Sequence, residues 1–174
     1  MAFSFLAARG AEVGRSLVEP ERYDDLRAAM KAAEARGVVV QLPEDVVAAA
    51  EPTASAERRT VLAGEVPRDL MGLDVGPRTV EEFVRIIAEA RTVFWNGPMG
   101  MFELEPFSAG TRGVARAVAA SSGFTVVGGG DSLAALRRFD LLGSIDHLST
   151  GGGASLEFLE GRDLPGVAVL TEEA

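Results

Sequence analysis

Continuous apolar runs and helix-like spacing alternate along the chain. Short, largely apolar runs predict strands that are buried on both faces, and they occur at residues 38–42, 92–95, 124–127 and, more weakly, 147–149. Strands of this kind, separated by helices, are typical of a parallel sheet covered on both faces. The pattern therefore predicts an α/β sandwich.

Helical spacing of apolar residues marks the segments between these strands. One helix is expected to start at Pro20 and to continue through residues 23–33 until Gly37 stops it. Thr79, Val80, Glu81 and Glu82 have the form of a capping box. Further helices are expected over residues 107–122, from residue 131 onward, and over residues 154–160. The Ala-rich residues 46–56 predict a loop, and residues 166–170 predict an extended tail.

Length and charge narrow the class of protein. The 174 residues and 18.2 kDa correspond to one domain that is able to bury a core. The net charge of −9 repels phosphate backbones, so we expect neither nucleic acid nor an anionic membrane as a partner. The absence of Cys excludes disulfides and thiolate chemistry, and a single histidine, His147, cannot form a histidine metal cluster. Lys31 is the only lysine.

No apolar run approaches the ~18 residues needed to span a bilayer. The first ten residues carry neither the basic region nor the long apolar stretch of a secretory signal. We therefore expect a cytoplasmic protein with no membrane partner.

Two glycine triplets are the most informative feature of the sequence. Gly128, Gly129 and Gly130 follow one predicted strand, and residues 151–153 follow the next. Glycine lets backbone N–H groups approach a ligand closely, and the helix start that follows adds unpaired donors and a positive dipole end. Such turns lie at the carboxyl ends of parallel strands, where open α/β sheets bind ligands. The triplets predict a phosphate site, with a pair of simple tight turns as the alternative.

Nearby polar residues have both a functional and a structural interpretation. Asp131 is either an N-cap or a carboxylate that meets the magnesium of a bound nucleotide. We interpret His147 as structural and Lys31 as a solvated surface residue. The P-loop pattern is missing, and the first triplet lacks the third glycine of a dinucleotide motif, although Asp146 leaves that alternative open.

A third turn follows the strand at residues 92–95. The Asn96-Gly97-Pro98 sequence forces a turn at the end of that strand. Glu103 is an acceptor for sugar hydroxyls or else an ordinary loop carboxylate. Composition and spacing alone therefore indicate a nucleotide-binding α/β domain.

Several of these segments together resemble a known family. WNGPMGMFE, VVGGGDS and HLSTGGGASLEFLEG followed by LPG occur in the order and spacing of the carboxyl-terminal domain of phosphoglycerate kinase. GRSLVE, LPEDVV and MGLDVGP extend the match over essentially the whole chain. The resemblance implies that residues 1–174 are a partial nucleotide-binding domain of a glycolytic transferase. That enzyme moves a phosphoryl group between 1,3-bisphosphoglycerate with MgADP and 3-phosphoglycerate with MgATP, and the resemblance implies a monomeric, cytoplasmic parent.

The resemblance also implies roles for individual residues. Gly72 would line the adenine pocket, Glu103 would hold the ribose, and Asn96 and Pro98 would flank the nucleotide. The phosphates would be surrounded by Gly129, Gly130, Asp131 and Ser132, with Asp131 toward Mg²⁺. The transferring phosphoryl group would meet Gly130 and the second triplet, Gly151, Gly152 and Gly153.

The match differs from the family at the amino-terminal end. The family fold is a three-layer sandwich with a Rossmann-like parallel sheet of order 3-2-1-4-5-6, of which this chain would hold strands 3 to 6. The domain that binds phosphoglycerate is also outside the match. We therefore expect the chain alone to be inactive. The alternatives are a free-standing nucleotide or dinucleotide binder and a fragment that binds no ligand.

Overall fold

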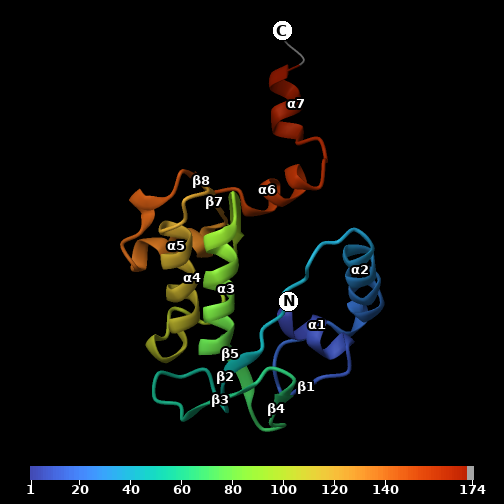
Figure 1. Ribbon diagram of the computed structural model, residues 1–174, viewed down its shortest axis with the longest axis vertical. Coiled ribbons are helices and arrows are strands. Elements are labelled where there is room, and N and C mark those ends of the chain that lie inside the picture. Colours follow the sequence, from blue (N-terminus) through green and yellow to red (C-terminus); the bar gives the residue numbers. More distant parts are fainter. Residues whose placement is uncertain (172–174) are drawn as a thin grey trace. The chain divides into compact units, whose positions relative to one another are not determined.

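The computed structural model describes residues 1–171, with the surroundings of side chains described up to residue 169. The chain forms two compact units, each described by itself below (Figure 1). The first unit comprises Met1–Arg85 and Met99–Val114, and the second comprises Ile86–Pro98 and the chain from Ala115 onward. No helix in the part of the chain that the structure describes is long and apolar enough to cross a membrane.

The first unit combines short sheets with helices. Strand β2 is the centre of an antiparallel sheet of order β3-β2-β5, and β1 pairs with β4 in parallel. The elements of this unit are α1 (Ala2–Ala8), β1 (Glu12–Val13), η1 (Pro20–Arg22), α2 (Tyr23–Ala35), β2 (Asp45–Ala49), β3 (Arg58–Leu62), β4 (Glu65–Val66), β5 (Met71–Val75) and η2 (Glu105–Phe107). Helices α3 (Pro77–Glu89) and α4 (Ala109–Ala119) begin here. One hydrophobic core cluster of this unit includes Leu6, Val46, Val66 and Leu70.

Two sequence predictions in this unit are wrong. Residues 38–42 do not form a strand, and β2 instead occupies residues 45–49, where a loop was expected. Val38 and Val39 are 57% and 80% exposed, so the apolar run has no core to enter. β2 pairs on both sides, and its small residues Ala48 and Ala49 are fully buried. A strand needs neighbouring strands to pair with its backbone N–H and C=O groups, and β2 has such neighbours.

The capping-box prediction is also wrong. α3 begins at Pro77, so Thr79 lies inside the helix rather than at its cap. The carboxylate of Asp45 accepts hydrogen bonds from the backbone N–H of Thr79 at 2.8 Å and from that of Arg78 at 3.2 Å. The first N–H groups of a helix have no acceptor within the helix. A side chain distant in sequence therefore supplies the cap.

The second unit contains a parallel sheet. Its strands are β6 (Thr92–Asn96), β7 (Phe124–Gly128) and β8 (His147–Ser149), in the order β6-β7-β8. Trp95 pairs with Val127, and Gly128 pairs with Ser149. Its remaining elements are α5 (Gly130–Arg138), η3 (Leu142–Ser144), α6 (Gly152–Leu159) and α7 (Pro165–Thr171). These three predicted strands and the α/β fold class are confirmed.

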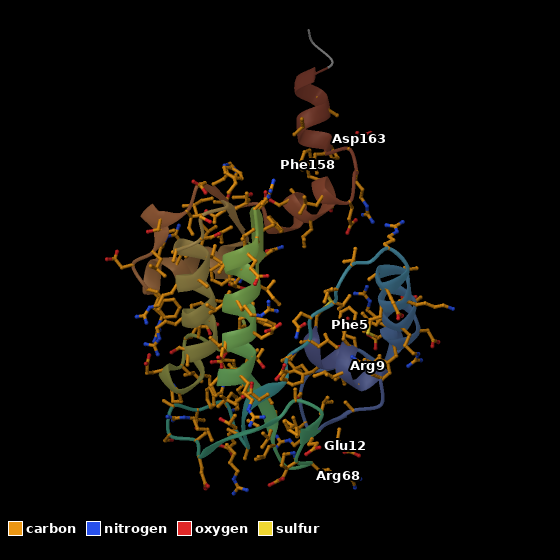
Figure 2. The ribbon with its side chains drawn as sticks, viewed as in Figure 1. Phe5, Arg9, Glu12, Arg68, Phe158 and Asp163 are labelled. Atoms are coloured by element: carbon orange, nitrogen blue, oxygen red, sulfur yellow. The ribbon has the colours of Figure 1, made fainter. Side chains whose placement is uncertain are left out.

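The carboxyl-terminal prediction is wrong. Residues 166–170 lie in α7 rather than in an extended tail, and Pro165 favours a helix start at that point. α6 has no buried residue, and Phe158 on it is 68% exposed (Figure 2). The expected helix over residues 107–122 is present as the shorter α4, and the short helix η2 precedes it.

Candidate functional site

The two glycine triplets converge in the second unit. A Cβ atom added to Gly152 would lie 2.8 Å from the Cα and 3.2 Å from the N of Gly129. Gly129 itself has a φ of +90°, a conformation that favours glycine. The N–H of Gly129 also donates to the carbonyl of Ser149 at 3.1 Å. The two backbones therefore touch, as strands β7 and β8 end side by side.

The side chain of Asn96 lies against both triplets. Its Nδ2 donates to the carbonyl of Gly152 at 3.5 Å, and its Oδ1 would be 2.7 Å from a Cβ on Gly129. β6 ends at Asn96, and the register pairs this residue with Gly128. The structure thus brings together three turns that the sequence predicted separately.

The turn after Asn96 is fixed by two further side chains. Gly97, with a φ of +110°, donates its N–H to the Oγ of Ser132 at 2.7 Å. The indole N–H of Trp95 donates to the carbonyl of Gly97, also at 2.7 Å. Ser132 is fully buried. Its hydroxyl therefore holds the turn that precedes Pro98.

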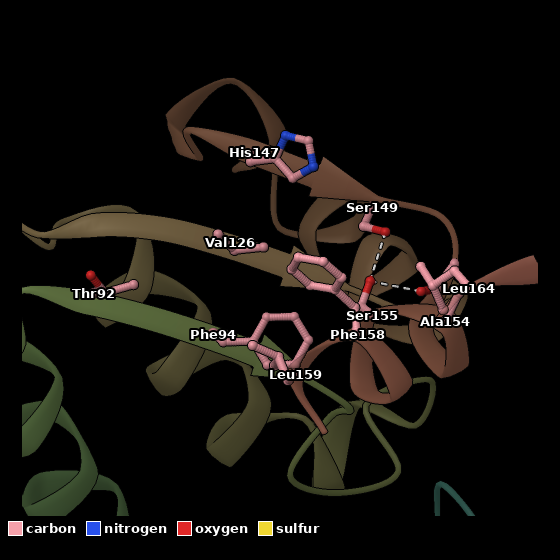
Figure 3. A pocket seen from close by; sticks show the side chains of 11 residues that line it. Thr92, Phe94, Val126, His147, Ser149, Ala154, Ser155, Phe158, Leu159 and Leu164 are labelled. Carbon is pink, nitrogen blue, oxygen red and sulfur yellow. Dashed lines mark hydrogen bonds between the residues drawn. The ribbon is translucent and has the colours of Figure 1, made fainter. Parts of the chain in front are cut away.

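The helix starts after the triplets are open. Added Cβ atoms at Gly130 and Gly153 would meet nothing within 4 Å, and Asp131 is exposed. The N–H groups of the first turn of α5 have no acceptor within that helix. In α6 the carbonyl of Gly151 accepts from the hydroxyl of Ser155 at 2.7 Å, and that hydroxyl lies 3.0 Å from the Oγ of Ser149 (Figure 3). Both starts can therefore offer backbone donors to an anion.

An apolar pocket of roughly 410 Å³ lies beside the second triplet (Figure 3). Its lining includes Phe94 and Val126 of the sheet and Phe158 and Leu159 of α6. His147 lines the pocket without an acidic partner in the hydrogen bonds that the structure shows for the described residues.

Asp146 lies away from the triplets. Its Oδ2 accepts hydrogen bonds from the N–H and the hydroxyl of Thr125, both at 2.8 Å. Thr125 is at the amino-terminal end of β7, whereas Gly128 is at its carboxyl end. These hydrogen bonds from Thr125 hold the pKa of Asp146 below its ordinary value. The geometry gives Asp146 a structural role rather than that of a ribose-binding acid.

In the first unit, Gly72 lies under the ring of Phe3. A Cβ on Gly72 would clash with that ring, and the N–H of Gly72 donates to the Oγ of Ser16 at 2.9 Å. A ligand at Gly72 would therefore meet an aromatic ring. Phe3 was missed in the sequence because its partner lies far away along the chain.

The segment that carries Glu103 is held in the same unit. Thr111 Oγ1 accepts from the N–H of Met99 at 3.1 Å and from that of Gly100 at 3.2 Å. The N–H of Met101 donates to the carbonyl of Leu73 at 2.9 Å. Glu103 itself is exposed.

Similarity to known proteins decides the family. The family description "Phosphoglycerate kinase" matches residues 1–162. The chain belongs to this family. The phosphoglycerate kinase of Thermomicrobium roseum is 55% identical over 174 residues, and that of Thermus thermophilus is 58% identical over 171 residues. These alignments cover 100% and 98% of this chain but only 44% of each relative. The chain thus spans less than half the length of these phosphoglycerate kinases.

Solved phosphoglycerate kinases share the fold. The structure from Coxiella burnetii has a TM-score of 0.94 at 43% identity and covers 99% of this chain and 44% of its own. The structure from Pyrococcus horikoshii has a TM-score of 0.80 at 31% identity, over 98% of this chain and 43% of its own.

Phosphoglycerate kinases use nucleotides with Mg²⁺, and the described residues can be tested against that ion. They contain no group of three His, Asp or Glu side chains able to hold a metal. Mg²⁺ is commonly bound by one or two carboxylates together with phosphate and water oxygens. The exposed Asp131 at the start of α5 fits an ion that arrives with a nucleotide and does not by itself form a resident metal site.

Proposed function

We propose that residues 1–174 form part of the carboxyl-terminal, nucleotide-binding domain of a phosphoglycerate kinase. The observation that carries this proposal is the contact between Gly129 and Gly152, beside which two helices begin. Backbone donors from two helix starts can surround phosphates without lysine, and the only lysine, Lys31, is exposed on α2. This agrees with the acidic character of the chain.

The proposed assignments divide the nucleotide among the residues described above. The phosphates are assigned to Gly129, Gly130, Asp131 and Ser132 at the start of α5, with Asp131 facing the Mg²⁺ that they carry. The second triplet, Gly151, Gly152 and Gly153, is assigned with Gly130 to the transferring phosphoryl group. Asn96 and Pro98 flank the nucleotide, the family resemblance assigns adenine to Gly72, and it assigns the ribose to Glu103.

The proposed reaction is phosphoryl transfer between 1,3-bisphosphoglycerate with MgADP and 3-phosphoglycerate with MgATP. Catalysis of this transfer is mainly positioning and neutralisation of charge. We propose that phosphoglycerate binds to a different domain of a cytoplasmic, monomeric parent enzyme, with no nucleic acid or membrane involved. A polypeptide of these 174 residues is expected to show no turnover of 3-phosphoglycerate with ATP.

Calorimetric titration of the chain with MgADP and, separately, with NAD tests the proposal. We expect MgADP to bind and NAD to give no saturable heat. Tighter binding of NAD would indicate a dinucleotide-binding module. The absence of binding by either compound to folded chain would indicate a fragment without a ligand and would overturn the proposal.

A further inference from the structure

A buried carboxylate at the end of β5 has no role in the proposed reaction. Asp74 is 3% exposed. Its Oδ2 accepts the N–H of Gly110 at 2.7 Å, and its Oδ1 accepts the N–H of Val75 at 2.9 Å. Gly110 lies in the first turn of α4, so this carboxylate caps a helix from a neighbouring strand.

Two backbone segments pack directly against this carboxyl group. A Cβ on either Gly100 or Gly110 would clash with Asp74 Oδ1, and one on Gly100 would also lie 2.6 Å from the Cα of Asp74. Gly100 belongs to the segment of residues 99–103, and Gly110 belongs to α4. Asp74 therefore sits where the segment, the helix and the strand meet.

Further hydrogen bonds of residues 99–103 are made to the neighbours of Asp74 and Gly110. Thr111, next to Gly110, accepts the N–H groups of Met99 and Gly100. Leu73, next to Asp74, accepts the N–H of Met101. Any shift of α4 relative to β5 would therefore move the segment.

The geometry points to Asp74 as a positioning residue that fixes residues 99–103, and with them Glu103, for contact with the ribose. The contact with the ribose rests on the proposed function, whereas the positioning of residues 99–103 by Asp74 does not. Asp74 acts through backbone groups and does not itself touch the nucleotide.

The positioning of residues 99–103 can be tested through the charge of Asp74. Burial raises its pKa to about 6, while hydrogen bonds from Gly110 and Val75 and the positive charge of Arg112 oppose the shift. Arg112 of α4 also pairs with Glu105 of η2 at 3.2 Å. Protonation removes the negative charge from the group that Gly110 donates to, so the bond to Gly110 weakens.

The first experiment follows backbone amide resonances of the full chain by NMR between pH 4.5 and 7.5. We expect the amides of Gly100, Met101 and Gly110 to shift with one common midpoint near pH 6, and Asp74→Asn to abolish this step. Asp69→Asn, an exposed acid of the same unit, is the control and should preserve the step. A step at Gly110 alone, or at none of the three, would overturn the proposal. Because the titration of the parent chain needs no variant, poor folding of Asp74→Asn does not prevent the test.

The second experiment compares the affinities for MgADP and for its 2′,3′-dideoxy analogue. We expect Asp74→Asn to lower the preference for MgADP by about tenfold, the scale of one hydrogen bond to a charged group. Thr111→Val should lower the same preference while leaving the Gly110 titration in place. An equal loss of both affinities would assign Asp74 a merely structural role. If the parent chain binds neither compound, the proposed function fails, while the NMR result still decides whether Asp74 holds the segment.

Discussion

A methyl group on Gly152 would come within 2.8 Å of the Cα of Gly129, so the two glycine triplets meet backbone to backbone. Only glycine at residue 152 permits this approach, because real Cβ atoms essentially never lie so close to another backbone. The contact explains why the turns that follow β7 and β8 lie together.

Gly152→Ala is therefore expected to separate the triplets. Overpacking of this kind costs about 1–3 kcal/mol of stability, and we expect the affinity for MgADP to fall by at least about tenfold. Calorimetry measures the affinity, and urea denaturation measures the stability. Gly143→Ala adds the same methyl group where nothing lies within 4 Å, so it should change neither value. Unchanged MgADP affinity in a folded Gly152→Ala chain would contradict the role of the contact.

Asp131→Asn is expected to weaken only the part of ADP binding that depends on magnesium. The carboxylate stands at a helix start assigned to phosphates, where it can meet a metal carried by the nucleotide. Titrations with and without Mg²⁺ should show a gain in affinity in the parent chain and a smaller gain in the variant. Asp163→Asn, an exposed acid elsewhere in the second unit, should keep the full gain. Equal affinity of the parent chain with and without Mg²⁺ would rule out the metal role.

The stability of the chain should depend on pH through Asp74. Its pKa is raised from 3.8 to about 6 by burial, so the folded chain binds this proton more tightly than the unfolded chain does. The free energy of unfolding should therefore fall as the pH rises from about 4 to about 6, by up to roughly 3 kcal/mol from this group, and this contribution should be constant above that range. Urea denaturation at several pH values measures the slope. Asp74→Asn should remove that contribution, and an identical slope in the parent and the variant would contradict the assignment.

The strands of the second unit could be predicted because a pattern within each strand's own residues indicates it. The largely apolar runs at residues 92–95 and 124–127 predict the strands found at residues 92–96 and 124–128, and the second run leads into a glycine triplet. Residues 38–42 carry the same signal and yet form no strand, because pairing depends on neighbours that a single run does not reveal. β3 was missed because its pattern is almost wholly exposed and begins with two arginines.

In the candidate site too, local sequence patterns predicted some residues, whereas contacts between distant residues were missed. The glycines and Asn96 were predicted from the turns in which they lie. The cap that Asp45 provides for Thr79 links residues 34 positions apart, and the ring of Phe3 reaches Gly72 from the start of the chain. No local pattern encodes such contacts. Asp74 was missed for the same reason, since its partners lie at residues 100 and 110.

The most direct test of the account is to map MgADP onto the backbone of the full chain. Amide resonances of the two triplets and of Asp131 and Ser132 are followed by NMR as MgADP is added. We predict that residues 129–132 and 151–153 shift together, along one binding curve with a single dissociation constant. Shifts confined to one triplet, or two curves with different dissociation constants, would contradict the claim that both triplets surround the same phosphates.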